Sequence, residues 1–344
     1  MYRIGKSNDY FNYEKENYEK ENLSIFLSFL KDPFHHINGK PILHNICEIN
    51  PNKEDIIYVL NNLSKDIISK KDGGLSVLHY LILNKKIYQK DLNYLKSLIM
   101  ILLNHKSDFD LINEDDYNGD TVLHYICENK LNLNIKIQNE MILFLLENGA
   151  CINKYNNYGN TPLLKICNNP NADFSTFKCL LDNDKHLINR WNHKDQSIIH
   201  LLCSQINNKI KEIKYIIKKY DYGNINMLLT DVDNRGWTCL HYICNNNNIN
   251  QELFDLLLEH GANINARAYF GKSCVDILFN NDPTKEDIIY LLENGAEIKK
   301  DKINRLKQFN FDEIEIKFKK NINNNLQLID DLCELVINYW SLFT

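Results

Sequence analysis

Histidine and cysteine are the residue types in this chain best suited to metal binding or nucleophilic catalysis. The 344 residues include 11 histidines and 10 cysteines, and many of them recur at regular intervals. Aligning the chain on itself gives seven anchor positions, 35 to 45 residues apart: His44, His79, His124, Leu164, His200, His241 and Asp276. A metal site needs ligands that converge on one point. The spacing therefore predicts structural histidines, with no metal, no cofactor and no catalytic residue.

The cysteines follow the same register. Five of them lie three residues after an anchor: Cys47, Cys127, Cys167, Cys203 and Cys244. No Cys-x-x-Cys pair suggests zinc, and a reduced cysteine packs as a small hydrophobe. Neighbouring members of this set would be about one helix spacing apart, roughly 10 Å, which is too far for a disulfide. We therefore expect buried thiols.

Other catalytic signatures are absent from the sequence. There is no phosphate-binding loop, no Gly-x-Ser-x-Gly, no His-Glu-x-x-His and no kinase signature. The acidic pairs Asp115-Asp116 and Asp330-Asp331 lack a partner constellation, and we interpret each as a solvated turn or helix surface. The chain is accordingly predicted not to be an enzyme.

Composition limits the partners and the compartment. The chain is 44% hydrophobic and 25% charged, with a formal net charge of −5, which gives no basic footprint for nucleic acid or an anionic membrane. The opening residues Met1–Lys6 lack the apolar core of a signal peptide, and the apolar run around Leu98–Leu103 is too short to span a bilayer. We expect a cytoplasmic protein, with the nucleus as an alternative.

Each anchor belongs to a longer repeated pattern. Leu123-His124-Tyr125-Ile126-Cys127 recurs as Leu240-His241-Tyr242-Ile243-Cys244. A glycine stands five residues before every anchor except His200, where Asp195 replaces it. An apolar run follows 16 to 24 residues after each anchor, and Gly-Ala closes three units, at Gly149, Gly261 and Gly295. Such internal periodicity indicates a stack of similar structural units.

This arrangement resembles the ankyrin repeat, whose signature is a Gly turn, Thr-Pro-Leu-His, a short helix, a Leu-rich helix and Gly-Ala. The best match runs from Asp233 to Asn265, and the resemblance covers roughly residues 38–300. It implies an all-α solenoid of about seven helix-turn-helix repeats. It also implies that the anchor histidines tie adjacent turns by hydrogen bonds, and that the cysteines fill a small apolar slot.

Local chemistry supports the same elements. Thr121, Thr161 and Thr238 stand where a hydroxyl would cap the first helix. The glycine of each turn supplies a positive φ, a conformation that aspartate also tolerates at Asp195. Because one helix pair cannot bury both of its apolar faces, each repeat needs its neighbours.

The flanking segments differ from the repeats. Residues 1–22 are interpreted as a charged arm, and residues 23–37 as an N-terminal capping helix. Residues 301–344 are predicted to form a C-terminal helical segment, which either caps the last repeat or docks on a partner. The candidate docking residues in this segment are Leu332, Val336, Tyr339 and Trp340.

Candidate partner-binding residues lie at the turn tips, within two residues of the glycine positions: Tyr117, Tyr158, Trp237, Tyr269 and Phe270. Exposed aromatic residues often anchor interfaces, although these could instead pack locally. The apparent insertions at Asn84–Asn93 and Glu128–Asn139 are read either as binding loops or as tolerated surface loops.

The repeat style, the Asn/Ile/Lys bias and the tail together are similar to poxvirus ankyrin proteins. That resemblance implies a non-enzymatic scaffold that binds and modulates a host signalling or antiviral protein. Residues 312–317 with 326–332 are similar to the PRANC or F-box-like segment through which such proteins recruit a cullin ubiquitin ligase. No proline follows Pro283, however, so the Leu-Pro that opens an F-box is absent. The alternatives are therefore a ubiquitin-ligase substrate receptor and a cellular ankyrin scaffold with no viral role.

Overall fold

The computed structural model describes residues 36–37, 40–49, 51–62, 67–105, 110–205, 209–220, 222–246, 249–281 and 283–298. The expected N-terminal arm, the capping helix before residue 36 and the segment 301–344 lie outside these described residues. The chain divides into two compact units. Unit 1 contains residues up to 166 together with 175–187, and unit 2 contains 167–174 together with residues from 188 onward. The two units are described separately below.

Unit 1 consists of helix pairs, preceded by one small hairpin. The hairpin pairs β1 (His36–Ile37) with β2 (Lys40–Pro41) in antiparallel register, and no strand was expected there. The helices are α3 (Ile42–Ile49), α4 (Lys53–Asn62), α5 (Val77–Leu83), α6 (Lys85–Lys90), α7 (Leu92–Leu103), α8 (Val122–Glu128), α9 (Ile135–Glu147), α10 (Pro162–Cys167) and α11 (Phe174–Asn183). A 3-10 turn, η2, spans Leu111–Asn113.

Unit 2 repeats this arrangement. Its elements are η3 (Lys185–Asn189), α12 (Ile198–Cys203), α13 (Ile210–Lys219), α14 (Tyr222–Thr230), α15 (Cys239–Cys244), α16 (Gln251–Glu259), η4 (Tyr269–Gly271), α17 (Cys274–Leu278), η5 (Phe279–Asn281) and α18 (Lys285–Glu293). Helix α14 was not expected. It buries Ile225, Leu228 and Leu229, which follow the i, i+3, i+4 spacing of an amphipathic helix.

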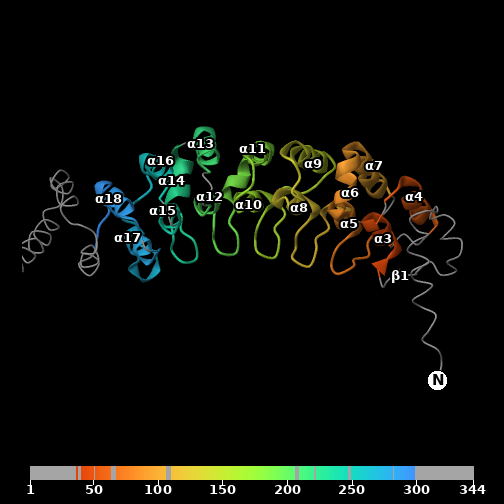
Figure 1. The fold of residues 1–344 in the computed structure, drawn as a ribbon, viewed down its shortest axis with the longest axis horizontal. Helices are drawn as coiled ribbons and strands as arrows, with labels where there is room; N and C mark the ends of the chain where they lie inside the picture. Colours follow the sequence, from red (N-terminus) through yellow and green to blue (C-terminus); the bar gives the residue numbers. More distant parts are fainter. Residues whose placement is uncertain are drawn as a thin grey trace, which may run out of the picture. The chain divides into compact units, whose positions relative to one another are not determined.

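Within each unit the short first helices form one layer and the second helices form another. The turns between repeats project beyond the first helices (Figure 1). First helices pack on the next first helix, as in α3 against α5 and α15 against α17. Leu43, Leu123, Leu240 and Leu257 are fully buried between these layers. The core is thus a stack of apolar layers in each unit, as the repeat pattern predicts.

The two apparent insertions are largely packed structure, which corrects the reading as surface loops. In the first, residues 85–90 form α6, with Ile87 and Tyr88 buried. Its N-cap Asn84 donates from Nδ2 to the carbonyl oxygens of Cys47 and Glu48 at 3.0 and 2.8 Å. In the second, α9 already begins at Ile135, so only residues 129–134 form a connection.

Candidate functional site

A Ser/Thr-x-x-His motif builds the base of the turns. The backbone N–H of Thr121 donates to His124 Nδ1 at 3.1 Å, and the Thr121 hydroxyl lies 2.9 Å from the same nitrogen. Because Nδ1 accepts the amide proton, the imidazole proton resides on Nε2. His124 Nε2 then donates to the Asn160 carbonyl of the next turn at 3.0 Å. Ser76, Ser197 and Thr238 make the equivalent contacts with their own histidines.

Four of the five anchor histidines therefore form what we call the histidine ladder, which ties adjacent turns as the resemblance implied. In unit 1, His79 Nε2 donates to the Asp120 carbonyl at 3.0 Å. In unit 2, His200 and His241 donate to the carbonyls of Asp231 and Lys272 at 3.2 and 3.3 Å. Burial lowers the pKa of all four ladder histidines, in the case of His79 to about 4. These side chains are neutral structural ties rather than acid–base groups.

Leu164 has no imidazole, and two further anchors depart from the ladder for identifiable reasons. His44 is preceded by Pro41, which has neither the amide N–H nor the hydroxyl that the other histidines use. Both of its ring nitrogens are buried without a hydrogen-bond partner among the residues that the structure describes, and burial lowers its pKa to about 4. At the last anchor, Asp276 replaces histidine, and its Oδ2 accepts the Ser273 backbone N–H at 3.0 Å.

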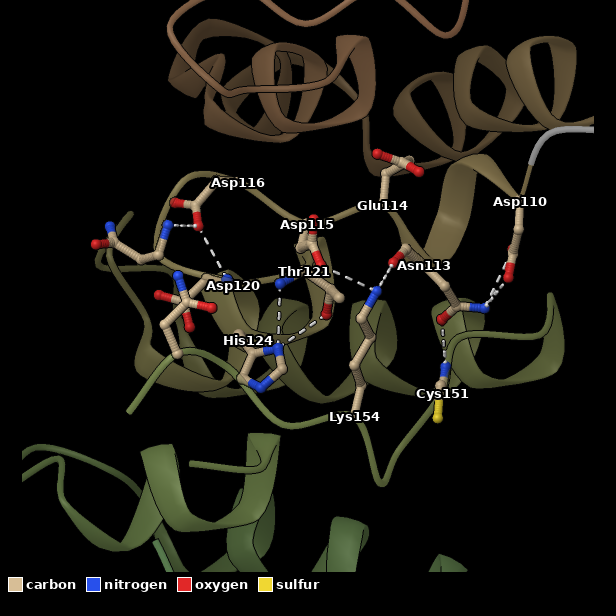
Figure 2. A network of polar contacts seen from close by, with 12 residues as sticks. Asp110, Asn113, Glu114, Asp115, Asp116, Asp120, Thr121, His124, Cys151 and Lys154 are labelled. Carbon is tan, nitrogen blue, oxygen red and sulfur yellow. Dashed lines mark hydrogen bonds and ion pairs between the residues drawn. The ribbon is translucent and has the colours of Figure 1, made fainter. Parts of the chain in front are cut away.

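A buried aspartate or asparagine organises each of four turns, and the burial of Asp116 corrects its reading as a solvated residue. Asp116 Oδ1 accepts the backbone N–H groups of Asn118 and Asp120 at 2.7 and 2.9 Å, while Oδ2 accepts the Tyr125 hydroxyl at 2.8 Å. Burial opposes ionisation here, but these hydrogen bonds hold the pKa of Asp116 below its ordinary value. Figure 2 shows this carboxylate inside the turn, with Asp115 on the opposite side.

Asp115 is also paired, although it lies at the surface. Lys71 Nζ lies 3.1 Å from its Oδ1, and Lys154 Nζ lies 3.3 Å from its Oδ2. These lysines come from the preceding and the following repeat, so the carboxylate connects three successive turns. Figure 2 shows the contact with Lys154. Despite partial burial, the two ammonium groups lower the pKa of Asp115.

Sequence reasoning missed the Asp116 position, although a signal was present. The residue three places before the positive-φ position is Asp116, Asn156, Asn192 or Asp233. In each case its Oδ1 accepts two backbone N–H groups of the same turn. A recurring Asp or Asn at this place is the signature of an Asx turn. The repeated Asp or Asn was visible in the sequence, three residues before the glycine position of each of these four turns.

Successive turns in each unit are held at close range by backbone contacts. Asn157 N–H donates to the Asn118 carbonyl at 2.8 Å in unit 1. A Cβ on Gly119 would lie 2.7 Å from the Asn157 nitrogen, so the position requires glycine for space as well as for its φ of +75°. Asp195 adopts a φ of +56°, which confirms that aspartate takes the glycine conformation in that turn.

The candidate aromatic residues fall into two groups. Tyr117, Tyr158, Tyr269 and Phe270 are 69%, 59%, 59% and 99% exposed. Trp237, by contrast, is half-buried, stacks on His241 with ring centroids 6.3 Å apart, and carries the Arg235 guanidinium 3.9 Å from its own centroid. These contacts give Trp237 a packing role. The four exposed rings remain as proposed contacts for a partner.

The five cysteines of the repeated slot are buried free thiols, and burial raises the pKa of each. Within the described residues, no group of three or more His, Cys, Asp or Glu is arranged to hold a metal ion. No helix in the described ranges combines the length and apolar character needed to cross a bilayer. The docking candidates Leu332, Val336, Tyr339 and Trp340 lie outside the described residues. So does the rest of the C-terminal segment, on which the ligase-recruiting alternative depends.

The turn geometry, the histidine ladder and the paired helices define a class, and comparison with known proteins agrees with it. Residues 164–268 match the family model described as "Ankyrin repeats (3 copies)". The chain contains ankyrin repeats, and its fold is an all-α ankyrin-repeat solenoid. Ankyrin repeats are a protein–protein interaction module and not a catalytic family.

Particular relatives come from a poxvirus. The chain is 25% identical over 256 residues to the ankyrin repeat protein OPG189 of variola virus, matched twice, once in the isolate Human/India/Ind3/1967. The aligned region is 73% of this chain and 36% of the relative. The chain thus spans about a third of the length of the curated relatives that it matches.

Proposed function

We propose that this protein is a viral adaptor that binds a host signalling or antiviral protein in the cytoplasm or nucleus. The observation that carries the proposal is the set of exposed aromatic side chains on turns with a rigid backbone. Tyr158 and Tyr269 belong to turns whose backbone is fixed by Asx bonds or by bonds to the neighbouring turn. A fixed backbone lowers the entropy cost of binding, and aromatic rings supply the contact area.

The mechanism that this site supports is occupancy. A protein that presents a rigid recognition surface acts by sequestering its target or by holding it beside another protein. The similarity to the variola ankyrin repeat protein supports a viral origin for this chain. The finer assignment, to a particular host target, depends on which protein the turn tips select.

The test is capture from host-cell extract with the immobilised full chain, followed by mass spectrometry. A Tyr269→Ala/Phe270→Gly double variant should lose the specific partner. Leu143→Ala is the matched control, because Leu143 is an exposed apolar residue of an outer helix, away from the turns. Retention of the partner by the double variant, or its loss with the control, would contradict the proposed surface.

A further inference from the structure

One turn position in unit 2 recurs in three successive turns that are joined through their backbones. The residue directly before the positive-φ position is Lys194, Arg235 and Phe270 in three consecutive turns, and we call this set the tip column. The turns are joined at this position, since Asn234 N–H donates to the Lys194 carbonyl at 3.0 Å and Tyr269 N–H to the Arg235 carbonyl at 3.1 Å. The axes of packed helices lie about 8–10 Å apart, and we take this as the approximate rise from one repeat to the next.

Phe270 is the unusual member of the column. Its φ and ψ are +62° and +19°, a left-handed conformation that is strained for a bulky L-residue. Its side chain is 99% exposed, so no packing within the described residues compensates for that strain. Glycine or asparagine would adopt the same backbone more easily. The exposed phenyl ring is therefore costly to the folded chain and is explained better by a contact with another molecule.

The other two members of the column are cationic. Arg235 is held in place by the Trp237 ring and by Asp233 Oδ2, 3.0 Å from its Nε, yet its side chain remains half exposed. Lys194 is exposed, and no carboxylate of the described residues lies within salt-bridge distance of its ammonium group.

The carboxylates around these turns are mostly engaged elsewhere. Asp233 is buried and already accepts from Tyr242 and two backbone amides, and Asp231 accepts the Trp191 indole N–H. Asp195 is the exposed exception beside Lys194. A further cation, Lys272, lies two residues after Phe270. The equivalent column of unit 1 is Gly73, Asn118 and Tyr158, which carries no cation.

We propose that the tip column binds an extended acidic segment of a partner protein. Carboxylates of the segment face Lys194 and Arg235, and an apolar side chain packs on Phe270 and the neighbouring Tyr269. An extended chain advances about 3.3 Å per residue, so a spacing of about 10 Å corresponds to every third residue. The expected motif is therefore two acidic residues and one apolar residue at intervals of three. This inference rests on the proposed function and assigns the chemistry of the partner.

The test pans a random twelve-residue peptide library against the immobilised full chain. Enriched peptides should carry Asp or Glu and an apolar residue at intervals of three. Their affinity, measured by fluorescence anisotropy, should fall as NaCl is raised, because exposed charges are screened. Enrichment of peptides without acidic residues would overturn the inference and leave the proposed function standing. Failure to enrich any peptide, together with failure to capture any host protein, would count against both.

Matched variants locate the binding surface. Lys194→Glu should lower the affinity for the selected peptides at least tenfold. Asn118→Glu, at the same turn position in unit 1, should leave that affinity within twofold of the value for the unchanged chain. Phe270→Gly should also weaken binding at least tenfold while raising the thermal midpoint, because glycine relieves the strain. A purely structural Phe270 would give a lower midpoint instead. Equal binding of a single-stranded oligonucleotide, or a salt-sensitive dimer of the chain without peptide, would also overturn the assignment.

Discussion

Two adjacent aspartates in one turn have opposite environments. Asp116 is buried and accepts three hydrogen bonds, whereas Asp115 lies at the surface between two lysines. A buried acceptor that loses its donors, or donors that lose their acceptor, cost about 1–3 kcal/mol. Exposed ion pairs contribute less than about 1 kcal/mol. The two positions should therefore respond very differently to the same substitution.

We expect Asp116→Ala to lower the free energy of unfolding by about 1–3 kcal/mol, because it orphans two amides and the Tyr125 hydroxyl. Asp116→Asn should cost less, since Asn156 and Asn192 perform the same role in their own turns. Asp115→Ala is the neighbouring control and should change stability by less than about 1 kcal/mol. Urea denaturation followed by circular dichroism measures all three. Equal losses at positions 115 and 116 would contradict the assignment.

Trp237 provides a second comparison at the residue scale. The sequence predicts that Trp237→Ala weakens partner binding and leaves the thermal midpoint nearly unchanged. The stacking on His241 and the Arg235 contact now lead us to expect a lower midpoint for Trp237→Ala. Tyr158→Ala should leave the midpoint nearly unchanged because that ring is exposed. Differential scanning fluorimetry on both variants separates a packing role from a surface role.

At the scale of elements, the paired helices and their caps were predictable from the sequence, whereas helices α6 and α14 were not. Thr121 and Thr238 cap first helices as expected, and Gly149, Gly261 and Gly295 have φ values of +91°, +100° and +85° after second helices. These features follow from local stereochemistry, which a sequence states directly.

The missed elements depend on contacts distant in sequence. Helix α6 is held by Asn84 reaching the carbonyls at the end of α3, some 36 residues away, and a spacing rule contains no such information. Helix α14 had an amphipathic signal at Ile225, Leu228 and Leu229, but the repeat alignment assigned no helix there. The sequence predicted that aromatic residues lie at the turn tips. It did not show that Trp237 packs on its neighbours, because that depends on the geometry of the side chains.

Helix α16 offers a direct test of the packed layers. Leu257 is fully buried in the second helix of its repeat. We expect Leu257→Ala to cost roughly 2–5 kcal/mol, as a buried large-to-small change does. Leu143→Ala on the exposed face of α9 should cost far less. Chemical denaturation monitored by tryptophan fluorescence compares the two, and similar losses would argue against this assignment of faces.

At the scale of the whole molecule, the buried histidines couple stability to pH. His44 and His79 have their pKa lowered to about 4 by burial, and that of His124, His200 and His241 is lowered as well. The unfolded chain, with histidine pKa values of about 6.5, therefore binds protons first as pH falls. The histidine contribution to stability is complete above about pH 6.5 and is lost progressively toward pH 4.

We accordingly expect the free energy of unfolding to fall by a few kcal/mol between about pH 6.5 and 4 for each of His44 and His79. Protonation of His124, His200 and His241 should lower it further. Aspartates such as Asp116 and Asp233, whose pKa lies below the ordinary value, add their loss only at lower pH. His124→Leu, which introduces the residue type that Leu164 supplies in the next repeat, should reduce the pH dependence in this window. Denaturant titrations at a series of pH values test this. A free energy of unfolding that does not change between about pH 6.5 and 4 would contradict the assignment of these histidines as buried and neutral.

The histidine ladder also gives each stack of repeats a direction. All four ties run from an imidazole N–H in one repeat to a carbonyl in the repeat that follows it. Deleting a repeat from the C-terminal end of a stack would therefore leave a buried imidazole N–H without its acceptor. Deleting a repeat from the N-terminal end would instead leave a backbone carbonyl without its donor, and water can solvate that carbonyl. Asp276 is consistent with this polarity, because a carboxylate closes its own turn through Ser273 without an N–H that must find a successor.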